Sequence, residues 1–312
     1  HTTPGGSSGI GKATAELFAS QGARVLNLDV NPPSRHVSSD VEYVRCDQSS
    51  WSDILAAFKF CPQIDIVVAN GGITESPNYF DDEYDEDGDL REPSQSIFKV
   101  NLIGTINVCK IAMSRMRRQP TGGSIVVTSS ATALMPEHSL PVYGACKTAL
   151  LGLVRALRCT SMLEHITINA VAPAATISNQ LPEKLAKPII EAGLPVSSAA
   201  HVALAILYAA TGSQDRQVER YGKDRCEDDR PGPWNGRTIL TLGDTWTEVE
   251  EPLVACRSSW FGLANERLTQ QQQAITDQRQ LPDMVDGRPV AGCEQVVYKA
   301  RGDDNSLYVS SD

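Results

Sequence analysis

The chain has 312 residues, an apolar share of 41% and a formal net charge of −10 at pH 7. This length and apolar content support a buried core in one large domain or two. The acidic balance argues against nonspecific binding to nucleic acid or to an anionic membrane, because both need clustered basic residues. No apolar run approaches the roughly 20 residues that cross a bilayer, and the first residues lack a signal-peptide pattern. The composition therefore predicts a soluble, cytoplasmic protein without nucleic-acid or membrane partners.

A glycine-rich segment near the N-terminus is typical of a dinucleotide-binding loop. Gly5, Gly9 and Gly11 open an amphipathic helical segment. Glycines at these spacings let the backbone approach a pyrophosphate that lies on the helix N-terminus. The apolar run 23–29 then ends in Asp29, where a ribose-binding carboxylate is expected. The alternative for Asp29 is an ordinary turn residue at the end of a strand.

The strand that normally precedes such a glycine loop is not evident. It occupies the middle of the sheet in dinucleotide-binding folds, and we expect residues 1–4 to be unable to supply it. Two explanations stay open. Either the sequence is truncated, which we favour, or the sheet has lost its central strand, which would leave unpaired strand edges and a packing defect.

Strand and helix patterns alternate along the chain, as in a doubly wound parallel sheet. We therefore expect a three-layer α/β fold of Rossmann type, with its first strand missing. Apolar runs predict strands over residues 23–29, 41–47, 65–70, 123–130, 166–171 and 238–242, the last of the sheet. Helical periodicity predicts helices over residues 51–60, 93–116 and 141–163.

Polar residues at strand ends are candidate cofactor contacts. Asp47 is a candidate partner for adenine, and the turn Asn70-Gly71-Gly72 would flank the cofactor, although all of them could simply form turns. Asn101 lies inside an otherwise apolar helix and has to satisfy its amide. It is therefore either a structural hydrogen-bonding residue or part of a water relay.

Tyr143 and Lys147 lie four residues apart on a predicted helix, so they share one face about one turn apart. The cation can stabilise a phenolate there. Ser130 ends a strand thirteen residues earlier, at the sheet edge where ligands of such folds bind. The loop between them would form a wall of a substrate site, although we expect its histidine to be exposed rather than catalytic. Candidate substrate contacts are Thr132, Met135, His138 and Leu140.

The remaining segments are less regular. Residues 81–92 are strongly acidic and predict a solvated loop, while 181–193 is a candidate helical lid. Residues 213–236 are polar and rich in Gly and Pro, which predicts an inserted loop of uncertain order.

We assign residues 1–245 to one dinucleotide-binding and catalytic domain. Residues 246–312 are then a C-terminal extension that either covers a neighbouring subunit or is partly disordered. The eight cysteines are scattered without metal-ligand spacing, so no metal site is predicted.

Together these residues resemble the short-chain dehydrogenase/reductase family over roughly residues 5–245. The family's Asn-Ser-Tyr-Lys tetrad falls on Asn101, Ser130, Tyr143 and Lys147. Its TGxxxGxG and NNAG motifs are matched with one change each, and its PG motif has become Pro-Ala. These departures bear on cofactor affinity more than on the fold. The cofactor site that the resemblance implies comprises Gly5, Ser7, Ser8, Gly9, Ile10, Gly11, Asp29, Asp47, Asn70, Gly71, Gly72, Tyr143, Lys147, Pro173, Thr176 and Ser178.

The resemblance implies an oxidoreductase that interconverts a secondary alcohol and a ketone. Tyr143 would act as acid and base, with Lys147 increasing its acidity and holding ribose hydroxyls. Ser130 would position the reacting oxygen, and Asn101 would order a water relay. NAD is the expected cofactor, because Asp29 would repel a 2′-phosphate. In addition, Ser8 and Val30 are neutral where phosphate-preferring members of the family carry a basic residue.

The acidic loop and the long C-terminal segment are similar to those of fungal members that work on secondary metabolites. This likeness favours a substrate with a polycyclic or polyketide skeleton. Two alternatives stay open: a cyclase, isomerase or dehydratase that uses the same tyrosine without net redox change, and a noncatalytic dinucleotide-binding scaffold. The resemblance also implies a homodimer or homotetramer packed through the helices that hold Asn101 and Tyr143.

Overall fold

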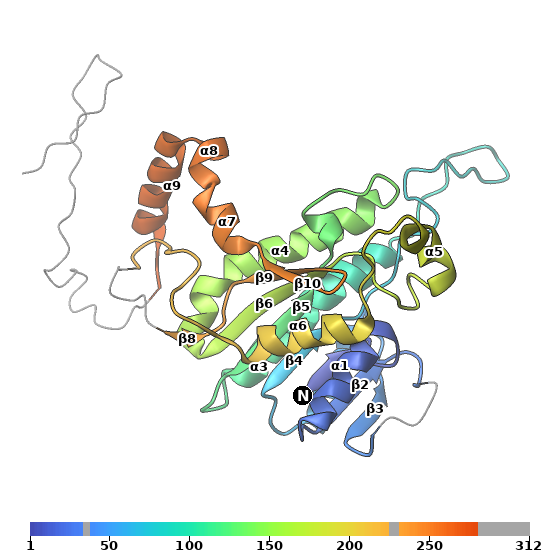
Figure 1. Cartoon of the computed structure of the whole chain (residues 1–312), viewed down its shortest axis with the longest axis horizontal. Coiled ribbons are helices and arrows are strands. Elements are labelled where there is room, and N and C mark those ends of the chain that lie inside the picture. Colours follow the sequence, from blue (N-terminus) through green and yellow to red (C-terminus); the bar gives the residue numbers. More distant parts are fainter. Residues whose placement is uncertain (34–37, 225–230, 280–312) are drawn as a thin grey trace, which may run out of the picture. The chain divides into compact units, whose positions relative to one another are not determined.

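One mostly parallel sheet organises the computed structural model, which describes residues 1–33, 38–224 and 231–279. The strands of the sheet are β1 (Thr2–Pro4), β2 (Val25–Asp29), β3 (Val41–Arg45), β4 (Ile66–Ala69), β5 (Gly123–Thr128), β6 (Ile166–Pro173), β9 (Thr238–Leu242) and β10 (Thr245–Glu248). Their order is β10-β9-β6-β5-β4-β1-β2-β3 (Figure 1). Only the β9–β10 pair is antiparallel. The order reverses at β1, as in the doubly wound fold that the sequence predicted.

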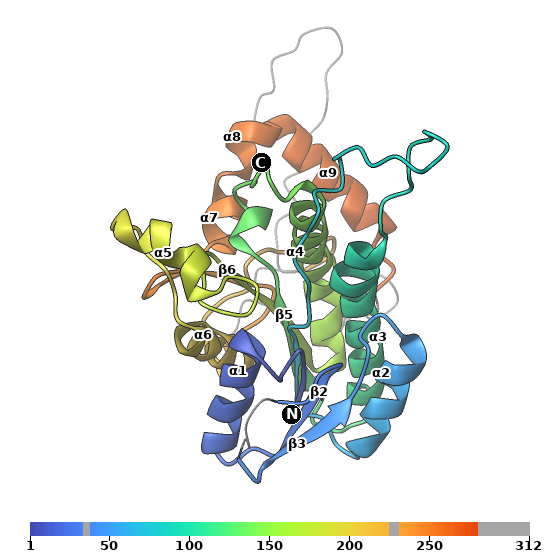
Figure 2. The ribbon, with the colours of Figure 1, turned by 90° about the vertical axis from the view of Figure 1, so that its right-hand side faces the viewer.

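Helices cover both faces of the sheet, which explains why its central strands are apolar throughout. In β4, Val67 packs in the core of one face, while Ile66 and Val68 pack in the core of the other. The first face is covered by α2 (Trp51–Ala57), α3 (Thr105–Met116) and α4 (Pro141–Ser161), and the second by α1 (Gly9–Ser20) and α6 (Ala199–Thr211). Figure 2 shows the sheet as the middle layer between two layers of helices. The three-layer prediction is confirmed.

The expectation that residues 1–4 cannot supply the central strand is wrong. β1 lies between β2 and β4, with Thr2 paired to Leu26 on one side and Val67 on the other. Thr2 and Thr3 are fully buried. Three residues are enough to join the ladder, because β-branched threonines suit a strand that is paired on both edges. No gap therefore opens in the middle of the sheet.

The predicted helix over 93–116 has a different shape in the structure. A π-helical segment (Phe98–Gly104) precedes α3 and carries the buried Asn101. Such widened turns are rare and are frequent at functional sites. The predicted lid over 181–193 contains one helix, α5 (Glu183–Glu191), with Pro188 inside it.

Strand β10 is absent from the sequence prediction. Gly243, with φ +57°, lies in the tight turn that joins β9 to β10, where a left-handed backbone favours glycine. The predicted domain boundary at residue 245 coincides with the first residue of β10. Residues His1–Asp277 form one compact unit.

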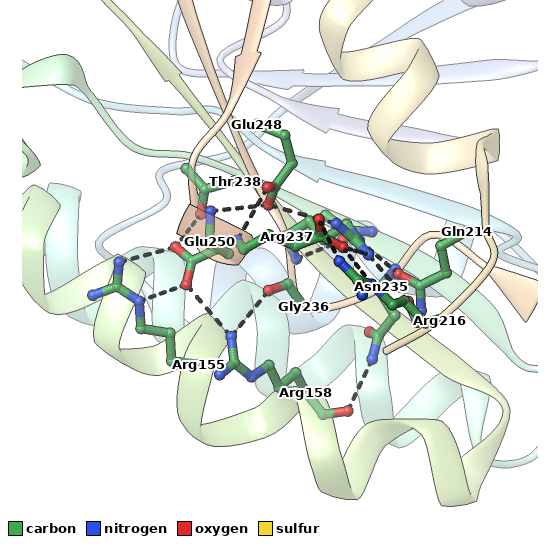
Figure 3. A network of polar contacts seen from close by, with 12 residues as sticks. Arg155, Arg158, Gln214, Arg216, Asn235, Gly236, Arg237, Thr238, Glu248 and Glu250 are labelled. Carbon is green, nitrogen blue, oxygen red and sulfur yellow. Dashed lines mark hydrogen bonds and ion pairs between the residues drawn. The ribbon is translucent and has the colours of Figure 1, made fainter. Parts of the chain in front are cut away.

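A buried carboxylate and two arginines fasten the chain beyond β10 to helix α4 (Figure 3). Glu250 is 1% exposed and begins α7 (Glu250–Ala255). Its carboxylate accepts hydrogen bonds from Nε and Nη2 of Arg155 at 2.8 and 2.9 Å. Nη1 of Arg158 donates to it at 3.4 Å, and Oγ1 of Thr238 donates at 2.9 Å. One carboxylate thus binds two arginines of α4 and a hydroxyl of β9.

The same network orders much of the predicted inserted loop. Gln214 and Pro233 belong to two short paired strands, β7 (Ser213–Gln214) and β8 (Gly232–Pro233). Nε of Arg237 donates to Oε1 of Gln214 at 2.7 Å (Figure 3). Residues 225–230 of this loop lie outside the described residues.

Two further helices follow α7 within the predicted extension. They are α8 (Arg257–Phe261) and α9 (Leu263–Thr276), and neither contains a buried residue. The last part of the predicted extension, residues 280–312, lies outside the described residues. Among the helices of residues 1–33, 38–224 and 231–279, none combines the length and apolarity that crossing a bilayer requires.

Candidate functional site

A cavity of about 870 Å³ lies at the carboxyl ends of β1, β2, β4, β5 and β6. Parallel strands end at one edge of the sheet, so residues far apart in the sequence meet there. The glycine loop and Asp29 line the cavity, and so do Ser130, Tyr143 and Lys147. The candidate cofactor and catalytic residues therefore share one continuous space.

The glycine loop needs glycine at each of its three motif positions. Gly5 and Gly9 have φ values of +72° and +50°, a left-handed backbone that side chains disfavour. A Cβ on Gly11 would lie 2.0 Å from the carbonyl oxygen of Gly5. The loop leads directly into the N-terminus of α1, where backbone N–H groups and the helix dipole favour an anion. This cradle fits the pyrophosphate of a dinucleotide.

Asp29 ends β2 and holds the glycine loop against the sheet. Its Oδ2 accepts a hydrogen bond from the backbone N–H of Ser7 at 3.2 Å, and its Oδ1 accepts from Asn31 N–H at 3.0 Å. Asp47, at the end of the next strand, also lines the cavity, and its Oδ1 accepts from the backbone and hydroxyl of Ser49. Both acids thus form turns, which was the alternative prediction for each of them, and both also line the cavity.

The turn after β4 connects the glycine loop to β5. Nδ2 of Asn70 donates to the carbonyl of Gly5 at 3.5 Å, while its Oδ1 accepts from Oγ1 of Thr128 at 3.1 Å. A Cβ on Gly71 would lie 2.2 Å from Oε1 of Gln48. The two glycines after Asn70 therefore allow a close backbone approach as well as a turn.

Ser130, Tyr143 and Lys147 meet beside the cavity. The Ser130 side chain interacts with the Tyr143 hydroxyl and favours its ionised form. Nζ of Lys147 lies 5.5 Å from the centre of the Tyr143 ring and donates to the carbonyl of Thr128 at 2.9 Å. Helix α4 supplies Tyr143 and Lys147, and the end of β5 supplies Ser130, so the sheet and the helix together fix the arrangement.

Burial shifts both titratable groups of this centre. Burial raises the pKa of Tyr143, and the interaction with Ser130 acts in the opposite direction. Lys147 is 3% exposed, and its burial lowers its pKa to about 8. The ammonium is therefore still mostly charged at neutral pH, which is the form that can stabilise a phenolate.

Asn101 is held by the backbone of a single residue. Its Oδ1 accepts from the N–H of Ile73 and its Nδ2 donates to the carbonyl of Ile73, both at 2.8 Å. The side chain is completely buried and does not line the cavity. The amide of Asn101 is thus satisfied within the protein and clamps the segment after β4, and a water relay at this residue stays a prediction.

The segment after β6 crosses over the cavity. Nε2 of Gln180 donates to the carbonyl of Gly72 at 2.9 Å, which links this segment to the turn after β4. A Cβ on Gly9 would lie 3.1 Å from Cβ of Ser178, so the segment also contacts the glycine loop. Pro173 and Thr176 line the cavity with it.

Three of the four candidate substrate residues line the cavity, and one does not. Thr132, Met135 and Leu140 line the cavity. His138 does not line it; its side chain is 98% exposed and Nδ1 lies 3.2 Å from the Glu137 carboxylate. The loop histidine therefore lies on the surface, outside the cavity.

Two predicted cofactor residues stand behind the cavity wall. Ser7 is buried, and its hydroxyl accepts from Nδ2 of Asn27 at 3.1 Å. Gly11 is packed under the carbonyl of Gly5 and does not line the cavity. Gly11 therefore shapes the loop, whereas Ser7 also lines a smaller pocket beside the cavity, together with Ser8 and Asp29.

Sequence reasoning missed three residues that hold this site together. Gln48 donates from Nε2 to the carbonyls of Gly71 and Val100 at 3.2 and 2.9 Å. Gln180 and Glu75 likewise make long-range contacts to the site. No local pattern marks them, because their partners lie far away in the sequence. The one sequence signal for Gln48 was its position directly after Asp47, at the end of a predicted strand.

Three comparisons with known proteins agree with this geometry. The family model for short chain dehydrogenase matches residues 3–187. The short-chain dehydrogenase/reductase prx4 of Penicillium roqueforti is 49% identical over 276 residues, 88% of this chain and 84% of that protein. A 5'-hydroxyaverantin dehydrogenase of Dothistroma septosporum is 30% identical over 196 residues, 54% of this chain and 64% of that protein. The structure of a 3-ketoacyl-(acyl-carrier-protein) reductase from Brucella melitensis complexed with NADH gives a TM-score of 0.61 at 20% identity, over 78% of this chain and 96% of that one, and supports the fold alone.

Proposed function

The chain belongs to the short-chain dehydrogenase/reductase family, and from this premise we propose that it is an NAD(H)-dependent oxidoreductase that interconverts a secondary alcohol and a ketone. One observation carries the proposal: Tyr143, Ser130 and the buried Lys147 meet at a large cavity, with the Lys147 ammonium 5.5 Å from the centre of the Tyr143 ring. This arrangement offers a proton donor and acceptor to an oxygen of the substrate.

The residues around the cavity fit a nicotinamide dinucleotide. The glycine loop and the N-terminus of α1 would hold its pyrophosphate, and Asp29 would bind a ribose hydroxyl. When bound, this cofactor supplies or accepts the hydride. Lys147 and the turn Asn70-Gly71-Gly72 line the other part of the same cavity and would hold its second half.

The proton chemistry belongs to the chain's own residues. In ketone reduction Tyr143 donates the proton of its hydroxyl to the carbonyl oxygen, and in alcohol oxidation its phenolate accepts the hydroxyl proton. Ser130 holds the same oxygen by a hydrogen bond. The positive charge of Lys147 stabilises the phenolate, because the buried ammonium lies beside the Tyr143 ring.

Asp29 supports a preference for NAD(H) over the phosphorylated cofactor. It lies at the end of β2 and lines the cavity, and a carboxylate there repels a 2′-phosphate. We expect kcat/KM to be higher with NAD(H) than with the phosphorylated cofactor. Asp29→Ala should reduce the ratio of the two kcat/KM values by about tenfold, which is the interaction energy that one pKa unit represents. Steady-state turnover with both cofactors measures this. A wild-type preference for the phosphorylated form would overturn the assignment.

The substrate end of the cavity favours an uncharged, apolar molecule. Leu134, Met135, Leu140, Leu181 and Leu242 line it. Of the described residues that line the cavity, Lys147 alone is a lysine or arginine, so an anionic substrate would find no other cation. We propose a polycyclic or polyketide-type secondary metabolite. The likeness to a fungal protein named as a 5'-hydroxyaverantin dehydrogenase supports the alcohol and ketone chemistry of the proposal.

Near-ultraviolet absorbance of the reduced nicotinamide tests the function directly. Product formed together with an equal change in reduced cofactor supports the oxidoreductase. Product formed without net change in absorbance would identify a cyclase, isomerase or dehydratase. Absence of product with a panel of polycyclic ketones and alcohols would favour a noncatalytic scaffold.

We further propose that the protein acts as a homodimer or homotetramer, with α4 in the contact. Its outer face exposes only small residues over three turns: Ala145, Thr148, Ala149, Gly152 and Ala156. Small side chains allow two helices to approach closely. Light scattering should give two or four times the mass of one chain, and Ala149→Glu should shift it toward the monomer. A monomeric wild type would contradict the proposal. The cytoplasmic location stays a prediction.

A further inference from the structure

The N-terminus of α4 receives its hydrogen-bond acceptor from a distant loop. Leu140, directly before the helix, offers no side-chain cap, and Pro141 has no N–H group. The N–H of Tyr143 instead donates to Oε2 of Glu75 at 2.8 Å, across 68 residues of sequence. Glu75 thus binds the backbone of Tyr143, the residue whose side chain carries the reacting hydroxyl.

Glu75 is a buried carboxylate whose partners are backbone groups. It is 8% exposed, and its other oxygen accepts from the N–H of Tyr79 at 3.0 Å. In the part of the chain that the structure describes, no Lys, Arg or His forms an ion pair with it. Burial of a lone carboxylate is unfavourable unless hydrogen bonds and a nearby positive potential compensate. The N-terminal end of the 21-residue helix α4 supplies that potential.

Three structural elements meet around this carboxylate. Val142 and Cys146 of α4 pack against Ile97, directly before the π-helical segment, and the rings of Tyr79 and Phe98 complete the cluster. The Tyr79 and Phe98 rings lie edge to face at 5.9 Å. Glu75 therefore ties the loop after β4 to the helix of Tyr143 within a packed apolar surrounding.

The same loop is clamped two residues earlier. Asn101 holds both backbone groups of Ile73, and Ile73 and Thr74 line the cavity while Glu75 does not. A continuous path thus runs from Asn101 through Ile73 and Glu75 to Tyr143. It joins two of the four tetrad positions through hydrogen bonds at both ends and the short chain segment 73–75 between them, and neither Asn101 nor Glu75 lines the cavity.

We propose that Glu75 is a positioning residue for Tyr143: its carboxylate anchors the first turn of α4 to the loop after β4 and so places the Tyr143 hydroxyl beside Ser130. The inference rests on the proposed function in one respect, since it assigns to Tyr143 the proton transfer described above. The role of Glu75 is confined to geometry, because its side chain does not line the cavity.

Glu75→Ala and Glu75→Gln separate this role from general stabilisation. The alanine variant leaves Tyr143 N–H without its acceptor, so we expect kcat to fall about 10- to 100-fold, as small misplacements of a catalytic group do. The glutamine variant retains one acceptor oxygen and should recover to within about tenfold of wild type. KM for NADH should change less than about twofold in both, because Glu75 lies outside the cavity. The assay uses trans-1-decalone, an uncharged bicyclic ketone, with NADH.

Glu248→Ala is a matched control. Glu248 also accepts from two backbone N–H groups at the start of a helix, those of Glu250 and Glu251 at 2.9 and 3.1 Å. It lies on β10 and does not line the cavity. We expect a similar loss of thermal stability with kcat unchanged. If Glu75→Ala lowers kcat no more than Glu248→Ala does, or changes kcat and KM for NADH together, the inference is wrong.

Hydrogen exchange tests the contact without any turnover. Peptides that contain residues 141–146 should exchange at least about tenfold faster in Glu75→Ala than in wild type, because the first turn of α4 opens more easily. The glutamine variant should lie between the two. Unchanged exchange in the alanine variant would overturn the inference even if the enzyme is active. An inactive wild type with the expected exchange would instead count against the proposed function alone.

Discussion

Replacing Tyr143 with phenylalanine should lower kcat about 10²- to 10⁴-fold, the usual contribution of a positioned acid or base. The change removes one oxygen and keeps the ring in its packed position, so the fold and the binding of NADH should be unaffected. Ser130 and Lys147 remain in place, but neither can take over a proton transfer that needs a group with the pKa and reach of the phenol. Reduction of trans-1-decalone followed by reduced nicotinamide absorbance measures the loss.

The pH profile makes this result specific. Burial raises the pKa of Tyr143, so the phenol is protonated near neutral pH and suited to act as an acid in ketone reduction. Alcohol oxidation needs the phenolate, so its rate should increase with pH from neutral until Lys147 loses the charge that stabilises the phenolate, near its pKa of about 8. Tyr143→Phe should abolish this increase, whereas Tyr208→Phe, a half-exposed ring on α6 outside the cavity, should keep it. An active phenylalanine variant with a wild-type profile would remove Tyr143 from the mechanism.

Replacing Glu250 with alanine should lower the free energy of unfolding by about 3–5 kcal/mol, the usual effect of removing one partner from a buried ion pair. The buried carboxylate binds Arg155 and Arg158 of α4 together with Thr238 (Figure 3). Its loss leaves Arg158, whose side chain is 6% exposed, with Glu219 as its remaining acidic partner. For a chain of this size the melting temperature should fall by several degrees. Denaturant unfolding followed by circular dichroism measures the change.

The loss should be confined to the region beyond β10. Hydrogen exchange should accelerate in residues 250–262 of Glu250→Ala, while the core around β4 and β5 stays protected. Glu191→Gln is the control, because Glu191 pairs with Lys187 at 3.5 Å on the exposed surface of α5. Such a pair contributes about 0–1 kcal/mol. Equal effects of the two substitutions would show that the network of Glu250 does not hold this segment.

Much of the site could be predicted because its signals are local. Tyr143 and Lys147 are one helical turn apart, and Gly5, Gly9 and Gly11 act through backbone geometry within a single loop. Asp29 could be placed because it ends an apolar run. Patterns of this kind depend on residues a few positions apart, and a single sequence contains them completely.

The features that the sequence analysis predicted wrongly or missed depend instead on contacts between segments that are far apart in the sequence. β1 has little apolar signal in Thr-Thr-Pro and is a strand because β2 and β4 pair with it on both sides. β10 exists because a glycine turn folds it back on β9. Glu75 was one of many acids in the sequence, and its importance comes from Tyr143, 68 residues away.

The sequence by itself determined the class of fold, the dinucleotide loop and the tyrosine-lysine pair, since each depends on short-range periodicity or spacing. Only the tertiary structure decided that three residues complete the sheet, that Asn101 clamps Ile73, that His138 lies on the surface, and that Glu75 and Glu250 are buried. Burial and long-range pairing depend on which segments meet in space. Hydrogen-bond partners of buried polar groups are therefore set by the folded chain rather than by the residues beside them in the sequence.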